Sequence, residues 1–351
     1  MLLERPDVSP DQVDTKYGRT PLSWAAEAGC KNVVKMLLRR EDVNPDQADT
    51  KCGRTPLWWA SGSGCYWVVK ILLERQEVNP SKPDTEYGGT PLSRAAENGH
   101  AKVVELLLER EDVNPNQAVT KDGQTLLSLA AAKGRVGVVK MLLGRKDVNP
   151  NQTDTKYGRT PLRRAARNGH LGVVKMLLER EDVKPDQPDT HYDRTLLSLA
   201  AAKGGVGVVK MLLGRKDVNP NRADTKYGRT PLLWAALNEC EGVLRVLLER
   251  EDVNPNQIDI EFGRTPLSWA AGKGYDGVVR MLLEREDVNP NRADTKYGGT
   301  PLPRAAESGH EGVVKMLLER NDIHTTTPDN QNQTPLSLAL SKGHRGVVRI
   351  L

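Results

Sequence analysis

Side chains that could do chemistry recur along this chain at a fixed spacing. Four of the six histidines share one recurring position, directly after a glycine: His100, His170, His310 and His344. Imidazole is the commonest metal ligand, so this histidine series could hold metal ions. Its closest members are one repeat apart, about 10 Å if helices stack, whereas ligands of one metal converge within about 4 Å. We therefore interpret each histidine as bonding locally at a turn between two helices.

Carboxylates form a second regular series. Its members are Asp14, Asp49, Asp84, Asp154, Asp189, Asp224, Asp259, Asp294 and Asp329. Two carboxylates within one site could perform general acid–base chemistry. The spacing keeps these aspartates in separate sites, so we predict that each one stabilises a loop turn.

A basic series follows the aspartates closely. It comprises Lys16 and Arg19, Lys51 and Arg54, Lys156 and Arg159, Lys226 and Arg229, then Arg194 and Arg264. Such a stripe could track phosphates. The adjacent aspartates neutralise much of it, and 51 Lys plus Arg against 46 Asp plus Glu leave a formal net charge of only +5. The expectation is a solvated loop surface, with nucleic acid a disfavoured partner.

Motifs of known catalytic sites are absent from the sequence, including a phosphate-binding loop, His-Glu-x-x-His, Gly-x-Ser-x-Gly and Cys-x-x-Cys. Four cysteines are too few for a disulfide framework. Cys30 and Cys65 share a repeat position, but stacked layers about 10 Å apart exceed the ~7 Å reach of a disulfide. We expect no enzymatic activity and no cofactor or metal. A reduced protein of the cytoplasm is predicted, with the nucleus as the alternative compartment.

Neither a membrane span nor a secretory signal is predicted. No run approaches 18 apolar residues, and the first five residues lack the apolar core of a secretory signal. The membrane is therefore not an expected partner.

The elements that position these side chains are repeats. A threonine followed by Pro-Leu or Leu-Leu recurs in steps of 35 at Thr20, Thr55, Thr90, Thr125, Thr160, Thr195, Thr230, Thr265 and Thr300, and a tenth copy at Thr334 comes one residue early. In the first copy, Thr20 can cap a helix that Pro21 begins and Gly29 ends. Apolar residues within 33–38 predict a second helix, which Asn44-Pro45 terminates.

Two helices of roughly eight residues are too short to persist alone in water. They are stable only if neighbouring repeats cover their apolar faces, so contacts should run mostly between adjacent repeats. Aromatic residues make up only 4% of the chain and include one phenylalanine, Phe262. The core should therefore be thin and built from Leu, Val and Ala.

The motifs Gly-x-Thr-Pro-Leu-x-x-Ala-Ala, Gly-His, Val-Val-x-x-Leu-Leu and Asp-Val-Asn resemble the ankyrin repeat. The resemblance implies an all-α repeat solenoid, a curved stack of helix-turn-helix units with projecting finger loops. We predict the end of a preceding repeat at 1–13, nine repeats of 35 residues at 14–328, and a truncated tenth repeat at 329–351.

The sequence departs from the family pattern in several places. The period is 35 residues rather than 33, so the fingers should differ in shape. The histidine that the family carries after Thr-Pro-Leu is replaced, most often by serine as at Ser23. Glu239 replaces the helix-ending glycine, which should cost about 1 kcal/mol if that backbone stays left-handed. Asp193 replaces a turn glycine, and aspartate tolerates that backbone.

Both ends fall inside a second helix, so we expect the sequence to be part of a longer chain. Repeats with Asn-Pro in the finger resemble the ankyrin arrays of filamentous fungi, which often follow a nucleotide-switch domain of the NLR type. This resemblance leaves an alternative function open, a spacer or sensor arm of a larger switch protein.

One aromatic position alternates between repeats. Trp24, Trp59, Trp234 and Trp269 share it, and leucine or arginine occupies it elsewhere. Alternation with leucine favours packing between helices, whereas the arginine copies favour a partly exposed surface for a partner. The second repeat is the most aromatic, and Trp58, Trp59, Tyr66 and Trp67 form a candidate hot spot.

Comparison between the repeats predicts a binding face. Buried-type positions stay constant, while two positions at the end of each first helix vary freely. In ankyrin proteins the matching positions and the finger tips contact the partner along the concave groove. We therefore predict a scaffold that binds a protein partner through Tyr17, Arg19, Glu27, Trp58, Trp59, Glu97, Asn98, Lys133, Arg167, Asn168, Lys203, Asn238, Lys273 and Glu307.

Overall fold

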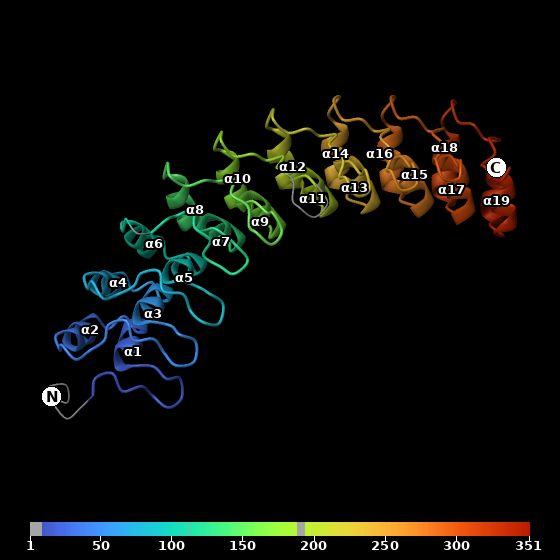
Figure 1. The fold of residues 1–351 in the computed structure, drawn as a ribbon. Helices are drawn as coiled ribbons and strands as arrows, with labels where there is room; N and C mark the ends of the chain where they lie inside the picture. Colours follow the sequence, from blue (N-terminus) through green and yellow to red (C-terminus); the bar gives the residue numbers. More distant parts are fainter. Residues whose placement is uncertain (1–8, 112, 188–193) are drawn as a thin grey trace. The chain divides into compact units, whose positions relative to one another are not determined.

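The computed structural model describes residues 9–111, 113–187 and 194–351, in two compact units. Unit 1 spans 1–183, unit 2 spans 184–351, and each is described by itself (Figure 1). The helices of unit 1 are α1 (Pro21–Glu27), α2 (Lys31–Leu38), α3 (Pro56–Gly62), α4 (Tyr66–Leu73), α5 (Pro91–Asn98), α6 (Ala101–Leu108), α7 (Leu126–Ala132), α8 (Val136–Leu143), α9 (Pro161–Arg167) and α10 (Leu171–Leu178).

Unit 2 continues the same alternation of two short helices per repeat. Its helices are α11 (Leu196–Ala202), α12 (Val206–Leu213), α13 (Pro231–Leu237), α14 (Glu241–Leu248), α15 (Pro266–Lys273), α16 (Asp276–Leu283), α17 (Pro301–Ser308), α18 (Glu311–Leu318), α19 (Pro335–Ser341) and α20 (Arg345–Ile350). Within the described ranges the chain forms no sheet, only an isolated bridge between Ala118 and Thr125. No helix found there is long and apolar enough to cross a membrane.

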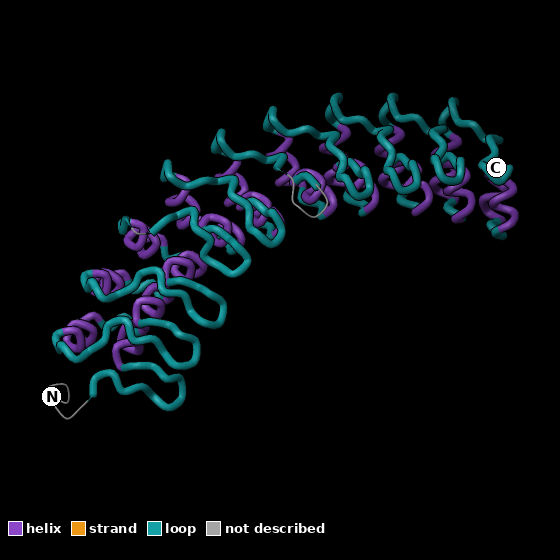
Figure 2. Tube along the Cα trace, viewed as in Figure 1, coloured by secondary structure: helices purple, strands orange, loops and turns teal. Residues whose placement is uncertain are grey.

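Helices stack in sequential order within each unit. The first helix of a repeat contacts the first helix of the next repeat, as α1 does α3 and α15 does α17, and second helices pair likewise. Within each unit, long loops extend beyond the first helices, and shorter loops follow the second helices at the other edge (Figure 2). These contacts confirm the predicted all-α repeat solenoid.

Caps set the limits of the first helices as predicted. In the described copies the Thr side chain accepts a hydrogen bond from the N–H three residues later, 3.2 Å from Ser23 to Thr20 in α1. Thr300 is the exception, because Pro303 stands three residues later and has no N–H to donate. The Oγ1 of Thr300 is consequently buried without a hydrogen-bond partner.

Left-handed backbone follows the first helices. Gly29 has a φ of +68° and its copies are similar, while Glu239 adopts +55° at the same position. The predicted strain at Glu239 is therefore present in the backbone. The matching expectation for Asp193 lies outside the described residues.

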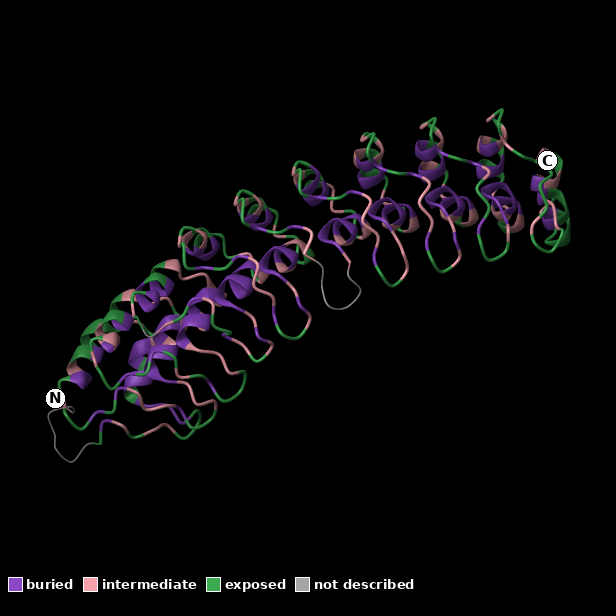
Figure 3. Cartoon of the chain, turned by 45° about the horizontal axis from the view of Figure 1, so that its top comes forward, coloured by how far each residue is buried: buried purple, intermediate pink, exposed green. Residues whose placement is uncertain are grey.

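The core is thin and aliphatic, as the composition predicts. Leu22 and Ala26 of α1 and Val34 of α2 are 0% exposed, and Leu37 is 1% exposed. Figure 3 shows this pattern recurring, with buried helix faces and exposed loop tips within each unit. Burial of these small faces between neighbours stabilises helices that are too short to persist alone.

The loop after each second helix is fixed by two kinds of bond. Arginines such as Arg180 donate from two nitrogens to the aspartate two residues later, and Arg180 Nη1 also donates to the Leu143 carbonyl of the preceding repeat at 3.0 Å. Farther along, Asn221 Nδ2 donates to the Asp252 carbonyl at 2.6 Å, and its Oδ1 accepts from the Asn254 N–H at 2.8 Å. Consecutive loops are thus bonded to each other.

Candidate partner-binding face

The finger turns are the six-residue turns that begin at a series aspartate and end before the threonine cap, the first being 14–19. Oδ1 of Asp14 accepts the N–H groups of Lys16 at 2.9 Å and Tyr17 at 2.6 Å, and Oδ2 accepts that of Arg19 at 3.0 Å. The hydrogen bond from Tyr17 is the main reason that the pKa of Asp14 falls to about 2. The predicted turn-stabilising role is confirmed at this aspartate, and Asp84 and Asp294 accept finger-turn N–H groups in the same way. Asp189 of the series lies outside the described residues.

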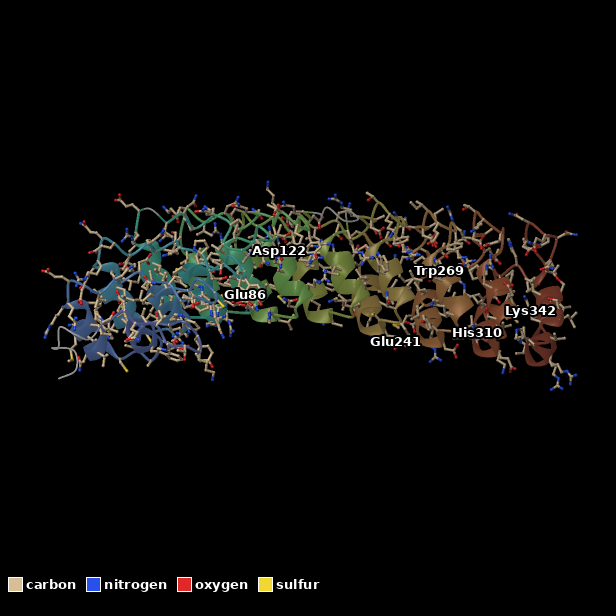
Figure 4. The ribbon with its side chains drawn as sticks, turned by 60° about the horizontal axis from the view of Figure 1, so that its bottom comes forward. Glu86, Asp122, Glu241, Trp269, His310 and Lys342 are labelled. Atoms are coloured by element: carbon tan, nitrogen blue, oxygen red, sulfur yellow. The ribbon has the colours of Figure 1, made fainter. Side chains whose placement is uncertain are left out.

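The tryptophan series is anchored to the finger turns. Trp24 Nε1 donates to Asp14 Oδ2 at 3.1 Å, Trp234 bonds Asp224 at 2.8 Å, and Trp269 (Figure 4) bonds Asp259. Trp24 is 42% exposed. The ring of Trp24 lies against the finger turn with part of its surface open to solvent, so packing between helices, the favoured interpretation of this position, does not describe Trp24. Trp59, Trp234 and Trp269 are half-buried.

Two of the three arginines at the tryptophan position make the same bond. Arg164 donates to Asp154 Oδ2 from Nε at 3.1 Å and Nη2 at 2.8 Å, and Arg304 binds Asp294 in the same way. Burial alone would raise the pKa of Asp294, but hydrogen bonds from the Tyr297 N–H and Arg304 hold that pKa below its usual range. Tryptophan and arginine alternate at this position because both carry N–H donors of suitable reach.

The arginines that end the finger turns are stacked, not solvated as the sequence analysis expects. The guanidinium of Arg19 lies 3.8 Å from the ring centroid of Trp24 and 3.7 Å from that of Trp59. It also pairs with Glu27 at 2.7 Å and is only 4% exposed. Arg229 and Arg264 stack similarly on rings in unit 2. Cation–π contact thus links the rings of successive repeats.

Most candidate contact residues lie at the surface. Tyr17, Lys133, Arg167, Asn168, Lys203, Asn238 and Lys273 are exposed, while Glu27, Trp59, Glu97, Asn98 and Glu307 are half-buried. Two candidates are not accessible. Trp58 is 5% exposed and Arg19 4%, because Trp58 bonds the Gly89 carbonyl of the next repeat and Arg19 is enclosed by two rings.

The aromatic hot spot predicted in the second repeat is divided between two helices. Ring contacts join Trp58 to Trp59 on α3 at 5.0 Å, and Tyr66 to Trp67 on α4 at 5.3 Å. Trp67 is 58% exposed. Of these four residues, Trp59 is the one that lines the groove described below with an accessible ring.

The histidines bond to the preceding repeat, which corrects the expectation of a local bond. His100 Nε2 lies 3.0 Å from the Gly62 carbonyl oxygen, and His310 (Figure 4) lies 3.2 Å from that of Gly272. Asn98 Nδ2 donates to the same Gly62 oxygen at 2.7 Å. These side chains join the ends of consecutive first helices.

A groove of about 850 Å³ lies in unit 1, between finger turns and the ends of first helices. Its walls include Trp59, Arg94, Glu97, Lys133 and Asn168. The groove is lined by residues of the second to fifth repeats and includes the fourth repeat, where the regular anchors are missing. Val119 replaces the series aspartate there and Leu129 replaces the tryptophan.

Charged pairs cross the groove wall. Glu97 is bound by Lys133 at 2.8 Å and by Arg94 at 3.3 Å. Burial alone would raise the pKa of Glu97, but its bonds with these two cations hold the pKa below the usual range. The carboxylate is therefore ionised at neutral pH and holds both cations at the rim.

Within the described ranges no three His, Cys, Asp or Glu residues are close enough to hold a metal ion. Cys30, Cys52, Cys65 and Cys240 are free thiols, and burial raises the pKa of Cys65 and Cys240. What the face offers is rings, cations and carboxylates arranged in rows, which suits recognition of another macromolecule.

Stacked helix-turn-helix repeats with finger turns along one edge define a class of helical repeat proteins. The family model of ankyrin repeats in three copies matches 1–84, 42–117, 76–154, 92–189, 181–259, 251–329 and 294–351. The chain therefore belongs to the ankyrin-repeat family. Proteins of this family are typically non-enzymatic modules that mediate protein–protein interaction.

One of the similar solved structures is the ankyrin repeat domain of Bcl-3, described as a unique member of the IkappaB protein family. It shares 26% identity with this chain at a TM-score of 0.56, over 66% of this chain and 99% of that domain. No curated protein matches this chain.

Several groove residues escape prediction from the sequence. Arg94, Tyr87, Lys121 and Asp122 line the groove although none stands in the variable column at the helix ends. The available signal was the loss of both anchors in one repeat, at Val119 and Leu129. This loss indicates a groove only because an aspartate and the tryptophan ten residues later bond to each other, and the structure shows that bond.

Proposed function

We propose that this chain is a non-enzymatic scaffold that binds a protein partner through its finger turns and the ends of its first helices. The observation that carries the proposal is a contrast between repeats. Buried positions of the first helix repeat almost unchanged, whereas the residues at its end vary between copies. Glu97-Asn98, Ala132-Lys133 and Arg167-Asn168 are successive examples in unit 1, and Ala202-Lys203 is the one pair that repeats an earlier copy.

The chemistry of this face supports recognition. Rings of Tyr17 and Trp24 are exposed at one finger turn, at 39% and 42%, and the rings are held by hydrogen bonds and stacking rather than left free. Preordered aromatic and arginine side chains are the usual energetic centres of protein interfaces, because little conformational freedom is lost on binding.

Affinity capture from a lysate of the source organism tests the proposal. The immobilised chain should retain a protein, and substitutions Glu97→Lys and Arg167→Glu should release it, about tenfold or more in affinity if either residue is central. Lys140→Glu is the matched control, because Lys140 is an exposed cation of the second helix α8.

Wild-type and control chains should retain the same protein. If both face variants retain the partner as well as wild type does, and Lys140→Glu alone loses it, binding uses the second helices and the proposed face is wrong.

A further inference from the structure

The groove in unit 1 exists because the fourth repeat lacks three side chains that other repeats carry. In the first repeat, three side chains fill the corresponding space: the series aspartate Asp14, Trp24 at the tryptophan position, and Arg19 at the end of the finger turn. In the fourth repeat the corresponding residues are Val119, Leu129 and Gln124. Replacement of a large donor-bearing side chain by Leu129, which is 7% exposed, leaves the space that forms the groove.

Arg94 borders this space and is poorly satisfied. Arg164 and Arg304, at the same repeat position, each send two N–H groups to a buried aspartate. Arg94 instead donates one long hydrogen bond, 3.3 Å to Glu97, and lies 5.0 Å from the ring of Trp58. Its Nε is buried without an acceptor among the described residues.

Cations exceed carboxylates on the groove wall. Five cationic side chains line it, against three carboxylates: Arg54, Arg94, Lys121, Lys133 and Arg164 against Asp84, Glu97 and Asp122. Four of the cations have partners: Arg54 pairs with Glu86, Lys121 donates to the Glu86 carbonyl, Lys133 pairs with Glu97, and Arg164 pairs with Asp154. The three carboxylates are engaged as well. Asp84 accepts three backbone N–H groups, Glu97 holds two cations, and Asp122 pairs with Lys156 at 3.2 Å.

An apolar wall lies beside these cations. Leu129 and the half-buried ring of Trp59 line the groove, and Tyr87 stands at its edge with 65% of its surface exposed. A guanidinium with free N–H groups binds a carboxylate in a planar fork. An apolar side chain of a partner would be stabilised by leaving water and packing against the rings of Trp59 and Tyr87.

We propose that the groove binds an acidic segment of a protein partner, with a carboxylate on Arg94 and Lys133 and a neighbouring apolar side chain against the rings of Tyr87 and Trp59. This inference rests on the proposed function and narrows it to one site and one partner chemistry. Arg94 is the central contact, because its Nε has no acceptor among the described residues, whereas Arg164 and Arg304 each bond the aspartate ten residues earlier. Asp84, the aspartate of its own repeat, accepts backbone N–H groups.

A displayed library of random linear peptides, selected on the full chain, tests the inference. Selected peptides should combine Asp or Glu with an aromatic or aliphatic residue. Affinity of a selected peptide should fall roughly tenfold or more with Arg94→Gln or Lys133→Glu, since hydrogen bonds between charged groups are the strong ones. Binding should also weaken as salt is raised.

Lys140→Glu is the matched control, because Lys140 is an exposed cation of the second helix α8, outside both the groove and the proposed binding face. Circular dichroism of each variant should match wild type. Selection of basic or uncharged peptides, or equal affinity for wild type, Arg94→Gln and Lys133→Glu, would overturn the inference.

Lysate capture separates this inference from the function on which it rests. If a captured partner ignores Arg94→Gln and Lys133→Glu but is released by Arg167→Glu, the scaffold function stands and the acidic-segment inference fails. If the partner is released by the groove variants and competed off by a selected acidic peptide, both stand.

Discussion

Two equivalent helix caps differ because of one residue. Thr265 and Thr300 stand at equivalent caps, but only Thr265 receives the N–H that the cap requires, because Pro303 replaces Ser268. This difference can be read from the sequence, because a proline three residues after a capping threonine has no N–H to donate and so predicts a missing hydrogen bond.

The two caps should therefore respond differently to removal of the hydroxyl. Thr265→Val should lower the free energy of unfolding by about 1 kcal/mol. Thr300→Val should lower it by less than half as much, because its Oγ1 has no partner to lose. Urea unfolding followed by circular dichroism measures both, and equal losses would contradict the assignment of the missing bond.

Glu239 is the second such residue. Its φ of +55° lies in the left-handed region that glycine occupies in other copies. Glu239→Gly should raise the free energy of unfolding by about 1 kcal/mol. Gly204→Ala is the reverse control, because an added Cβ there meets only Cys240 Sγ, at 3.5 Å, and should cost a similar amount. A stabilising Gly204→Ala would refute the backbone argument.

Trp58 shows why a candidate contact can be wrong. Its ring was expected at the partner face, yet its repeat position holds Ser23, Ser93 and Ser128, which are all buried. The position within the repeat determines how exposed a side chain is, so Trp58 is buried like the serines at the same position. Residue type alone, an aromatic residue in an aromatic-rich repeat, predicts instead that Trp58 contacts a partner.

At the scale of the element, the loops after second helices hold one another through asparagine. Asn221 both donates to the next loop and accepts from it. Asp186 stands at the same position and accepts the Asn219 N–H at 2.9 Å, but a carboxylate has no N–H with which to donate. Burial raises the pKa of Asp186, with a further contribution from the nearby charge of Asp217.

Asp186→Asn should therefore raise the free energy of unfolding at neutral pH by about 1 kcal/mol, by adding the missing donor. A folded-state pKa above the unfolded value means that ionisation of Asp186 costs stability above that pKa. The advantage of the variant should shrink as pH falls through the raised pKa and Asp186 takes up a proton. Urea unfolding across acidic and neutral pH checks this, and a constant difference would contradict it.

The elements themselves could be predicted from the sequence because each limit has a local cause: a threonine, a proline or a glycine. The finger turns were harder. Stacking of Arg19 between two rings and the bond from Trp24 to Asp14 join residues of adjacent turns and helices. Such pairings depend on how finger turns and helices are placed relative to one another in space, and the spacing of residues along the sequence does not determine that placement.

At the scale of the molecule, stability should be transmitted between neighbouring repeats and fade with distance. Within unit 2, Leu212 of α12 and Leu317 of α18 are equivalent and fully buried, at 0% exposure. Each Leu→Ala change should cost about 2–5 kcal/mol.

Amide hydrogen exchange should locate that loss. Leu212→Ala should speed exchange most in α11–α14, and Leu317→Ala most in α17–α20. Uniform acceleration through the unit from either variant would contradict coupling between neighbours and favour a single cooperative globule.

The central claim is that finger turns and first-helix ends bind a protein. Hydrogen exchange of the chain, measured free and saturated with its captured partner, tests this most directly. The account predicts slower exchange at the finger turns and first-helix ends, such as 84–98 and 120–133, with no change along the exposed side of α6 and α8. Protection confined to those second helices, with the finger turns exchanging as in the free chain, would contradict it.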